Sequence, residues 1–282
     1  MTVFLAPPPA GRLAAIVLSA ALAIVQPSTG DVDPLHKPFD EILDLYVRDG
    51  LVYYHALRNE RARFDRYIDS ISGVTADALK SWPRERQLAY WINAYNAFVL
   101  RTVIDNYPIR GRSAEYPQNS IRQIPGAFER RQFKAGGRML TLDAIEKDVI
   151  GEFGEPRAML ALGRGALGSP RLKSEAFTAD RLTAQLDTMQ SELVTRRELV
   201  FVDIANERLS VNPIFSWREG VFTKSLANRA PAVYASRSPI ERAVLALIDP
   251  LLVPTETDYL RKNTFRMAFS DFDWKLNDLT GR

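Results

Sequence analysis

The strongest hydrophobic pattern in the chain lies at residues 84–107. Apolar residues recur there at intervals of three and four, at Leu88, Trp91, Ile92, Tyr95, Val99 and Val103. The other side of this predicted helix carries small, amide and apolar residues in place of charges, at Ala89, Asn93, Asn96, Ala97 and Leu100. A helix that is apolar nearly all round is buried on most sides, so the pattern predicts a long central buried helix.

Two asparagines, Asn93 and Asn96, lie one turn apart on this helix. A buried amide without hydrogen-bond partners costs about 1–3 kcal/mol, so each must meet a loop backbone, another side chain or a ligand. Most buried polar groups bind other protein groups, which favours two loops held by the amides. A ligand-binding role for Asn93 and Asn96 stays open.

Shorter elements are predicted on both sides of the central helix. Helical periodicity and N-cap residues predict helices at residues 38–48, 57–72, 76–82, 142–149, 179–196 and 239–248, with Thr75, Thr141 and Thr178 as N-caps. Strands or hairpins are predicted at residues 51–54, 128–134 with 138–140, 199–204 with 208–211, and 265–269. Residues 158–162 form a buried strand or helix segment, followed by a glycine-rich turn at residues 163–170. With no repeats and no second linker, the pattern predicts a single α+β domain at residues 38–282.

The N-terminus resembles a targeting segment. Arg12 precedes an apolar stretch at residues 13–25 that only Ser19 interrupts, and this stretch is too short to span a bilayer comfortably. Ala21 and Ala23 form a small-x-small pattern that signal peptidase accepts. We predict a signal peptide at residues 1–23, a linker at residues 24–37 and a periplasmic or secreted protein with no stable transmembrane span. An uncleaved anchor is the alternative.

Composition narrows the chemistry. The 282 residues include no cysteine and only two histidines, His36 and His55, which excludes a thiol nucleophile and disulfides and argues against an ordinary zinc site. No metal and no cofactor are therefore expected. The net charge of +3 is small and the basic residues are scattered, so nucleic acid is not an expected partner. The glycine-rich turn lacks the known phosphate-loop patterns.

Six ordered motifs resemble the bacterial and plant domain-of-unknown-function family 547. They are residues 90–97 (YWINAYNA), 142–146 (LDAIE), 156–157 (PR), 168–170 (GSP, with Leu172), 214–217 (IFSW) and 273–277 (DWKLN). The resemblance extends from about Val47 to Asn277, nearly the whole mature chain. It implies little about biochemistry, because the family itself has little assigned function.

The departures from the family pattern bear on catalysis. The resemblance implies a histidine where this chain has Lys147, a cysteine where it has Ser169, and a second cysteine at the position of Arg164. We infer from residue types alone that such a cysteine and histidine act as the nucleophile and base of papain- and transglutaminase-like hydrolases. This chain has lost both, which is the expected trace of an inactive descendant.

A replacement dyad of Ser169 and Lys147 is the alternative. Serine needs a strong base, and lysine serves only when burial depresses its pKa by several units. Otherwise Ser169 is a turn residue before Pro170 and Lys147 is a solvated helix residue. Glu146 either faces the interior or caps a loop, and we favour a structural salt bridge over a catalytic role.

Four further residues have competing interpretations. Arg164 either binds a ligand carboxylate or phosphate, or forms an ion pair with Glu146 or a C-terminal carboxylate. We favour the ion pair. Asp273 is expected to be a buried carboxylate that accepts backbone amides, and Trp274 to fill the core, with a ligand-binding role for both residues as the alternative. His55 is expected to be half-buried and satisfied, with a catalytic base as the alternative.

These interpretations predict an exported protein with a groove where the central helix meets the glycine-rich turn. The preferred hypothesis is a catalytically degenerate, thiol-hydrolase-like domain that binds a peptide, a glycan or an envelope protein there. The alternative is a hydrolase or acyl-transferase that uses Ser169 with Lys147 or His55. A purely scaffold role in the envelope stays open.

Overall fold

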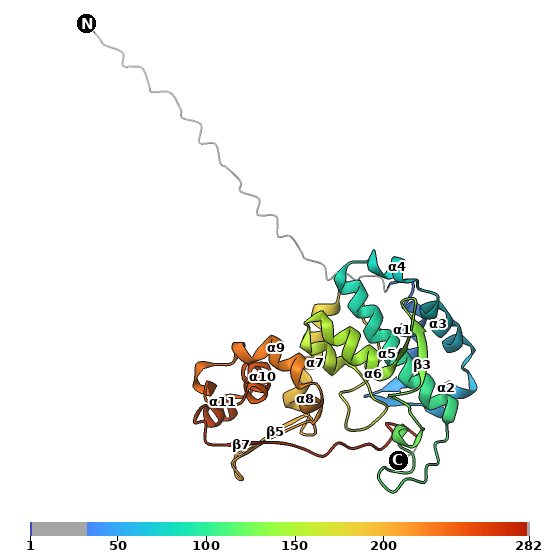
Figure 1. Ribbon diagram of the computed structural model, residues 1–282. Coiled ribbons are helices and arrows are strands. Elements are labelled where there is room, and N and C mark those ends of the chain that lie inside the picture. Colours follow the sequence, from blue (N-terminus) through green and yellow to red (C-terminus); the bar gives the residue numbers. More distant parts are fainter. Residues whose placement is uncertain (2–32, 281–282) are drawn as a thin grey trace. The chain divides into compact units, whose positions relative to one another are not determined.

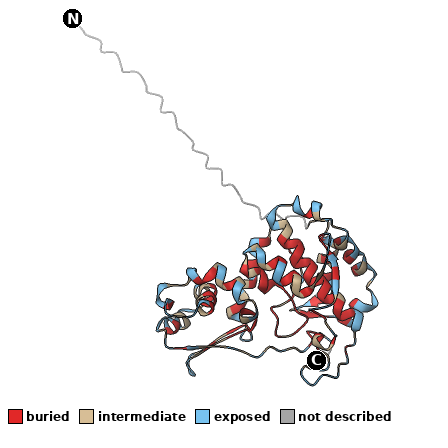
Figure 2. Ribbon diagram, viewed as in Figure 1, coloured by how far each residue is buried: buried red, intermediate tan, exposed pale blue. Residues whose placement is uncertain are grey.

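The central helix of the fold is α5 (Arg84–Asn106), as the hydrophobic pattern predicts (Figure 1). Every residue from 88 to 100 is buried, and Figure 2 shows this helix as an almost continuous buried segment. It contacts helices α2 (Tyr54–Asn59), α3 (Ala62–Ser72) and α6 (Leu142–Ala144). The apolar surface of α5 on nearly every side is therefore covered by other parts of the chain.

The computed structural model describes Met1 and residues 33–280, which include most of one compact unit, Asp31–Arg282. The predicted signal peptide, apart from Met1, and most of the predicted linker lie outside the described residues. No helix within residues 33–280 has the length and apolar character that crossing a membrane requires. The α+β class is confirmed, whereas a papain- or transglutaminase-like arrangement stays a prediction.

The N-terminal part of the unit is helical around one small hairpin. Helix α1 (Lys37–Tyr46) is followed by β1 (Val47–Arg48) and β2 (Leu51–Val52), which pair antiparallel. The single helix predicted at residues 57–72 is wrong, because the chain turns at Glu60 between α2 and α3. Tyr46 donates a hydrogen bond of 2.7 Å to the Glu60 carboxylate at this turn. Helix α4 (Ala76–Lys80) begins at the predicted Thr75 cap.

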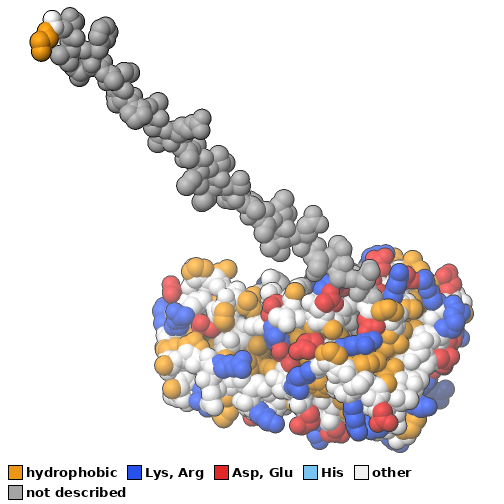
Figure 3. Space-filling view, turned by 90° about the horizontal axis from the view of Figure 1, so that it is seen from above, with side chains coloured by type: hydrophobic (Ala, Val, Ile, Leu, Met, Phe, Trp, Pro, Cys, Tyr) orange, Lys and Arg blue, Asp and Glu red, His pale blue; other side chains and the backbone are white. Residues whose placement is uncertain are grey.

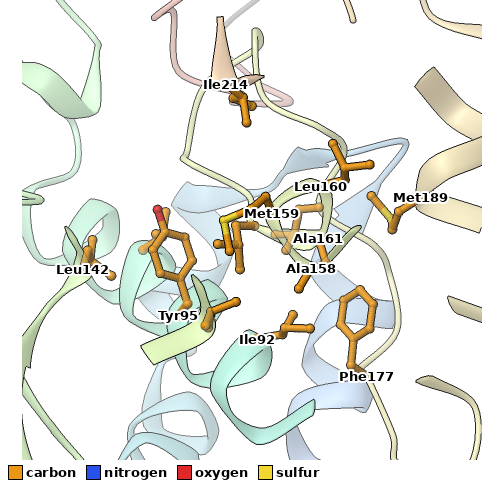
Figure 4. Close-up of a cluster of buried hydrophobic side chains, with 14 of the residues drawn as sticks. Ile92, Tyr95, Leu142, Ala158, Met159, Leu160, Ala161, Phe177, Met189 and Ile214 are labelled. Atoms are coloured by element: carbon orange, nitrogen blue, oxygen red, sulfur yellow. The ribbon is translucent and has the colours of Figure 1, made fainter. Parts of the chain in front are cut away.

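The middle of the chain places short, irregular helices beside α5. Strands β3 (Gln132–Ala135) and β4 (Arg138–Thr141) form the predicted hairpin and lead into α6, whose N-cap is Thr141. The helix then widens into a π-helical turn, η2 (Ile145–Val149), and tightens into the 3-10 helix η3 (Ile150–Phe153). The ambiguous apolar stretch at residues 158–162 lies largely in another 3-10 helix, η4 (Pro156–Ala161). Its side chains belong to the buried cluster around Ile92 and Tyr95 (Figure 4).

The C-terminal part combines helices with a three-stranded sheet. Helix α7 (Leu182–Thr195) starts later than predicted, because its N-cap is Arg181 and the Thr178 N–H donates to the Gln185 side chain. Strands β5 (Val200–Asp203) and β6 (Arg208–Val211) are antiparallel, and β7 (Arg266–Phe269) joins β6 in parallel. Between β6 and β7 lie helices α8 (Ile214–Trp217), α9 (Glu219–Leu226), α10 (Pro239–Ile248) and α11 (Pro254–Arg261).

The segment after β7, residues 270–279, is an extended strap that binds three distant parts of the chain. Its backbone hydrogen-bonds to Val211, to the glycine-rich turn at Leu167 and Gly168, and to Val52. The Asn277 side chain accepts a hydrogen bond of 2.7 Å from the Tyr54 hydroxyl and donates one of 2.8 Å to the Gly50 carbonyl. This C-terminal strap fixes the position of the glycine-rich turn and of the aromatic residues that precede Asn277.

Candidate functional site

The two buried amides of α5 hold two loops. The Asn93 side chain donates to the Phe177 carbonyl at 2.8 Å and accepts from the Phe177 N–H at 2.9 Å. In the same way Asn96 donates to the Ala161 carbonyl at 3.0 Å and accepts from the Gly163 N–H at 2.9 Å. Both amides therefore bind backbone groups, rather than another side chain or a ligand. Asn96 in particular fixes the start of the glycine-rich turn.

Within that turn Ser169 has a structural contact. Its hydroxyl oxygen accepts a hydrogen bond of 3.0 Å from the backbone N–H of Arg164, and its side chain is buried. Gly165 takes a φ of 65°, a left-handed conformation that glycine adopts without strain. The two positions at which family resemblance implies cysteine, 164 and 169, therefore lie against each other inside this turn.

The two candidate bases for Ser169 lie on the surface. Lys147 is exposed on the π-helical turn η2, and no hydrogen bond or ion pair among the described residues joins it to Ser169. His55 is exposed rather than half-buried, with its Nδ1 3.4 Å from the Asn59 amide. The expected burial of His55 is wrong because it lies on the outer side of the short helix α2. The proposed dyads stay predictions.

The charged centre of this region is Glu146, which is 1% exposed. Its Oε1 lies 2.5 Å from Nη2 of Arg164, itself buried, and 2.8 Å from Nε of Arg218. The Arg164 contact is a hydrogen bond, whereas the Arg218 N–H is not aligned on the oxygen and the contact is ionic. Tyr95 on α5 donates a hydrogen bond of 3.1 Å to Oε2. Of the alternatives for Arg164, the pairing with Glu146 is therefore the one present.

Burial and these partners act in opposite directions on the ionisation of Glu146. Burial opposes its negative charge, but the guanidinium groups of Arg164 and Arg218 outweigh that effect and hold the pKa of Glu146 below its ordinary value. Burial lowers the pKa of Arg164, but the Glu146 carboxylate outweighs it and the net shift is upward. Burial raises the pKa of Tyr95 well above its ordinary value. At neutral pH the centre is a charged carboxylate between two cations, next to a neutral phenol.

A pocket of about 300 Å³ opens above this centre. We call it the aromatic–arginine pocket, and it is lined by Arg122, Phe128, Asp143, Glu146, Arg164, Trp217, Arg218 and Trp274. Asp143 lies one helical turn before Glu146, and its carboxylate is 3.6 Å from the Arg218 guanidinium. Burial raises the pKa of Asp143, and Arg218 only partly opposes that rise. Two carboxylates with opposite pKa shifts therefore line one pocket, a combination that is enriched at functional sites.

Aromatic rings form one wall of this pocket. The indoles of Trp217 and Trp274 stack with their centroids 5.8 Å apart at an angle of 16°, and Phe272 packs against both. The Arg122 guanidinium lies over the rings of Phe128 and Trp274, at 4.8 and 4.7 Å from their centroids. Trp217 is 39% exposed, so this wall presents an open aromatic face.

The C-terminal strap contributes Trp274 to this wall but does not bury Asp273. The expected burial of Asp273 is wrong, because its side chain is exposed and accepts the Lys275 N–H at 3.0 Å within a tight local turn. It is the Asp273 backbone carbonyl that binds the glycine-rich turn, by accepting the Gly168 N–H at 2.8 Å. Trp274 is only partly buried, since it packs beside the pocket rather than inside the core.

Of the predicted site residues, three line the pocket: Glu146, Arg164 and Trp274. Sequence reasoning did not select Asp143, Trp217 and Arg218, although the first two lie inside motifs noted for the family resemblance. A test for charged or aromatic residues within those motifs could have found them. Arg122 lies outside the predicted elements and Phe128 at the start of the predicted strand at residues 128–134, and neither carried a signal of its own.

Metal-binding clusters are absent from the described residues, and charges of both signs share the face that Figure 3 shows. Residues 33–280 contain no group of three or more His, Asp or Glu side chains placed to hold a metal ion. Figure 3 shows basic and acidic side chains interspersed over the face in view. The chemistry of the region is therefore that of paired charges beside aromatic rings.

The fold is of the α+β class, and one comparison with known proteins gives a match. Residues 79–194, the central part of the chain, match the family model described as protein of unknown function, DUF547. The match does not extend over nearly the whole mature chain as expected, and the motifs at 214–217 and 273–277 lie outside it. Neither a curated protein nor a solved structure matches the chain.

Proposed function

We propose that this protein is an exported, non-catalytic member of its family that binds a ligand in the aromatic–arginine pocket. The absence of catalysis is inferred from the hydrogen bond between Ser169 and the Arg164 backbone. The Ser169 hydroxyl oxygen is buried and accepts the Arg164 N–H, whereas a nucleophile needs an accessible hydroxyl beside a base. The described residues that line the pocket include none of Ser169, Lys147 and His55.

The binding part of the proposal rests on how the pocket is built. Its floor is a fully buried ion pair that several elements hold in place, with Glu146 on η2, Arg164 in the glycine-rich turn and Tyr95 on α5. π-helical turns are rare and often lie at functional sites. An open aromatic wall beside convergent polar groups is the usual composition of a small-molecule or peptide site.

The alternative is a hydrolase or acyl-transferase that uses Ser169 with Lys147 or His55. A fluorophosphonate probe, which labels activated serines, tests it on the purified protein with an active serine hydrolase as positive control. We expect no labelling above the level of Ser169→Ala. Labelling of the wild type that Ser169→Ala abolishes would establish the enzyme and overturn the non-catalytic proposal.

Ligand binding at the pocket needs a separate test. We expect the purified protein to bind members of a peptide array or a glycan array, and Trp217→Ala to remove that binding. The matched control is Phe269→Ala, because Phe269 has a similar exposed fraction of 41% and does not line the pocket. Equal binding by wild type and Trp217→Ala, or no binding at all, would contradict a ligand site in this pocket.

A further inference from the structure

The charges around the aromatic–arginine pocket are balanced pair by pair. Arg164 and Arg218 share Glu146, Arg218 also approaches Asp143, and Arg122 forms an ion pair with Glu129. A ligand with a net charge would have to compete with one of these pairs. Separating the buried Glu146–Arg164 pair is strongly unfavourable, because it leaves one charge uncompensated. The partly exposed pairs of Arg122 and Arg218 likewise leave no unpaired charge at the pocket for an ionic ligand. The balance favours an uncharged ligand.

The mouth of the pocket nevertheless presents both hydrogen-bond acceptors and donors. The Asp143 side chain is 44% exposed, and its carboxylate accepts no hydrogen bond from the described residues. The Arg218 guanidinium lies 3.6 Å from it. An ionised carboxylate only accepts hydrogen bonds, and a guanidinium only donates them. Neighbouring hydroxyl groups satisfy both, since each hydroxyl donates one hydrogen bond and accepts others.

The aromatic wall of the pocket favours an apolar face on the same ligand. Trp217 is 39% exposed, and its indole packs against Trp274 and Phe272. A supported aromatic ring of this kind offers a flat apolar surface with a polar edge. The ligand therefore has hydroxyls at its rim and a flat C–H face, within a volume of about 300 Å³. That volume lies at the small end of the range for ligand pockets, ~300–1,000 Å³, and suits one or two rings.

We propose that the pocket binds an uncharged saccharide. One sugar ring stacks on Trp217, and its neighbouring hydroxyls donate to the Asp143 carboxylate and accept from the Arg218 guanidinium. This inference rests on the proposed function, because it names the ligand class of the same pocket.

The test compares the full chain on three arrayed sets of probes. These are uncharged glycans built from glucose, galactose, mannose and N-acetylglucosamine, glycans with uronic or sialic acids, and a peptide library. The variants are Trp217→Ala, Asp143→Asn and the control Phe269→Ala, each checked for folding by circular dichroism. We expect at least one uncharged glycan to bind, with affinity about tenfold lower in Trp217→Ala. Asp143→Asn removes the ionised acceptor without changing the shape of the side chain, so it should also weaken binding, and Phe269→Ala should leave it unchanged.

The outcomes separate this inference from the proposed function. Trp217-dependent binding of peptides, or of acidic glycans alone, would overturn the uncharged saccharide while the pocket stays a binding site. Absence of binding to all three sets, or binding that neither Trp217→Ala nor Asp143→Asn weakens, would overturn both. If Trp217→Ala does not fold, Asp143→Asn decides by itself.

Discussion

Arg164 donates a hydrogen bond to Glu146, and this charged pair is buried beneath the aromatic–arginine pocket. The two residues come from segments 18 positions apart, the π-helical turn and the glycine-rich turn. Their contact connects the π-helical turn that carries Lys147 with the glycine-rich turn that carries Ser169. The space between these elements is thus filled by a salt bridge, which positions both of them.

Glu146→Gln should lower the free energy of unfolding by about 3–5 kcal/mol. Glutamine keeps the shape of the side chain but leaves the buried Arg164 guanidinium without a counter-charge, and an uncompensated buried charge costs about that much. Urea denaturation followed by circular dichroism measures the change. The matched control is Glu129→Gln, because Glu129 is 48% exposed in its pair with Arg122. Glu129→Gln should lower the free energy of unfolding by less than about 1 kcal/mol. Equal losses in both variants would show that the buried pair stabilises the fold no more than the exposed pair does.

The stability of the protein should fall between neutral pH and about pH 4 because of His36. This histidine is buried beside the Tyr67 hydroxyl, and burial lowers its pKa from 6.5 to about 4, with Asp33 raising it and Arg86 lowering it. At pH values between about 4 and 6.5, His36 binds a proton in the unfolded chain but not in the folded chain. Stability is therefore complete above pH 6.5 and decreases as the pH falls towards 4, by about 3 kcal/mol in total.

Urea denaturation at a series of pH values tests this slope. His36→Gln should flatten it between pH 6.5 and 4, whereas His55→Gln should leave it as in the wild type, because His55 is exposed. The pKa of Glu146 is also lowered, but the stability it provides is lost only as the pH falls below the ordinary carboxyl value of 4.5. A slope that persists in His36→Gln would contradict the assignment.

Gly168→Ala should detach the C-terminal strap from the glycine-rich turn. A Cβ atom at this position would lie 2.7 Å from the backbone nitrogen of Asp273, so the strap must move and the contact with the Asp273 carbonyl is strained. We expect a loss of roughly 1–3 kcal/mol, as for other overpacked sites, and a change in tryptophan fluorescence as Trp274 shifts. Gly220→Ala is the control, since a Cβ there meets no atom within 4 Å. It should be neutral or stabilise α9 by up to about 1 kcal/mol, and a similar loss in both variants would refute the role of the strap.

Much of the fold follows from local patterns. The periodicity of residues 84–107 predicts the buried helix α5, and alternation with turn residues predicts the hairpins β3–β4 and β5–β6. Local patterns fail where a long-range contact decides the conformation. The turn at Glu60 is an example, because the side chain of Tyr46, from α1, binds the Glu60 carboxylate there. At the start of α7 the contact is local instead, since Gln185 of the same helix accepts the Thr178 N–H.

The residue pattern alone predicts that α5 is buried, that Asn93 and Asn96 need partners, and that Ser169 and Lys147 stand where family resemblance implies other residues. The stacking of Trp217 on Trp274 and the meeting of Arg218 and Arg164 at Glu146 follow from the folded structure. Spacing along the chain fixes which face of an element is apolar, but it does not fix which distant segment covers that face. Here the pocket is made by segments far apart in the chain, and the C-terminal strap brings Trp274 to it where the strap crosses the glycine-rich turn.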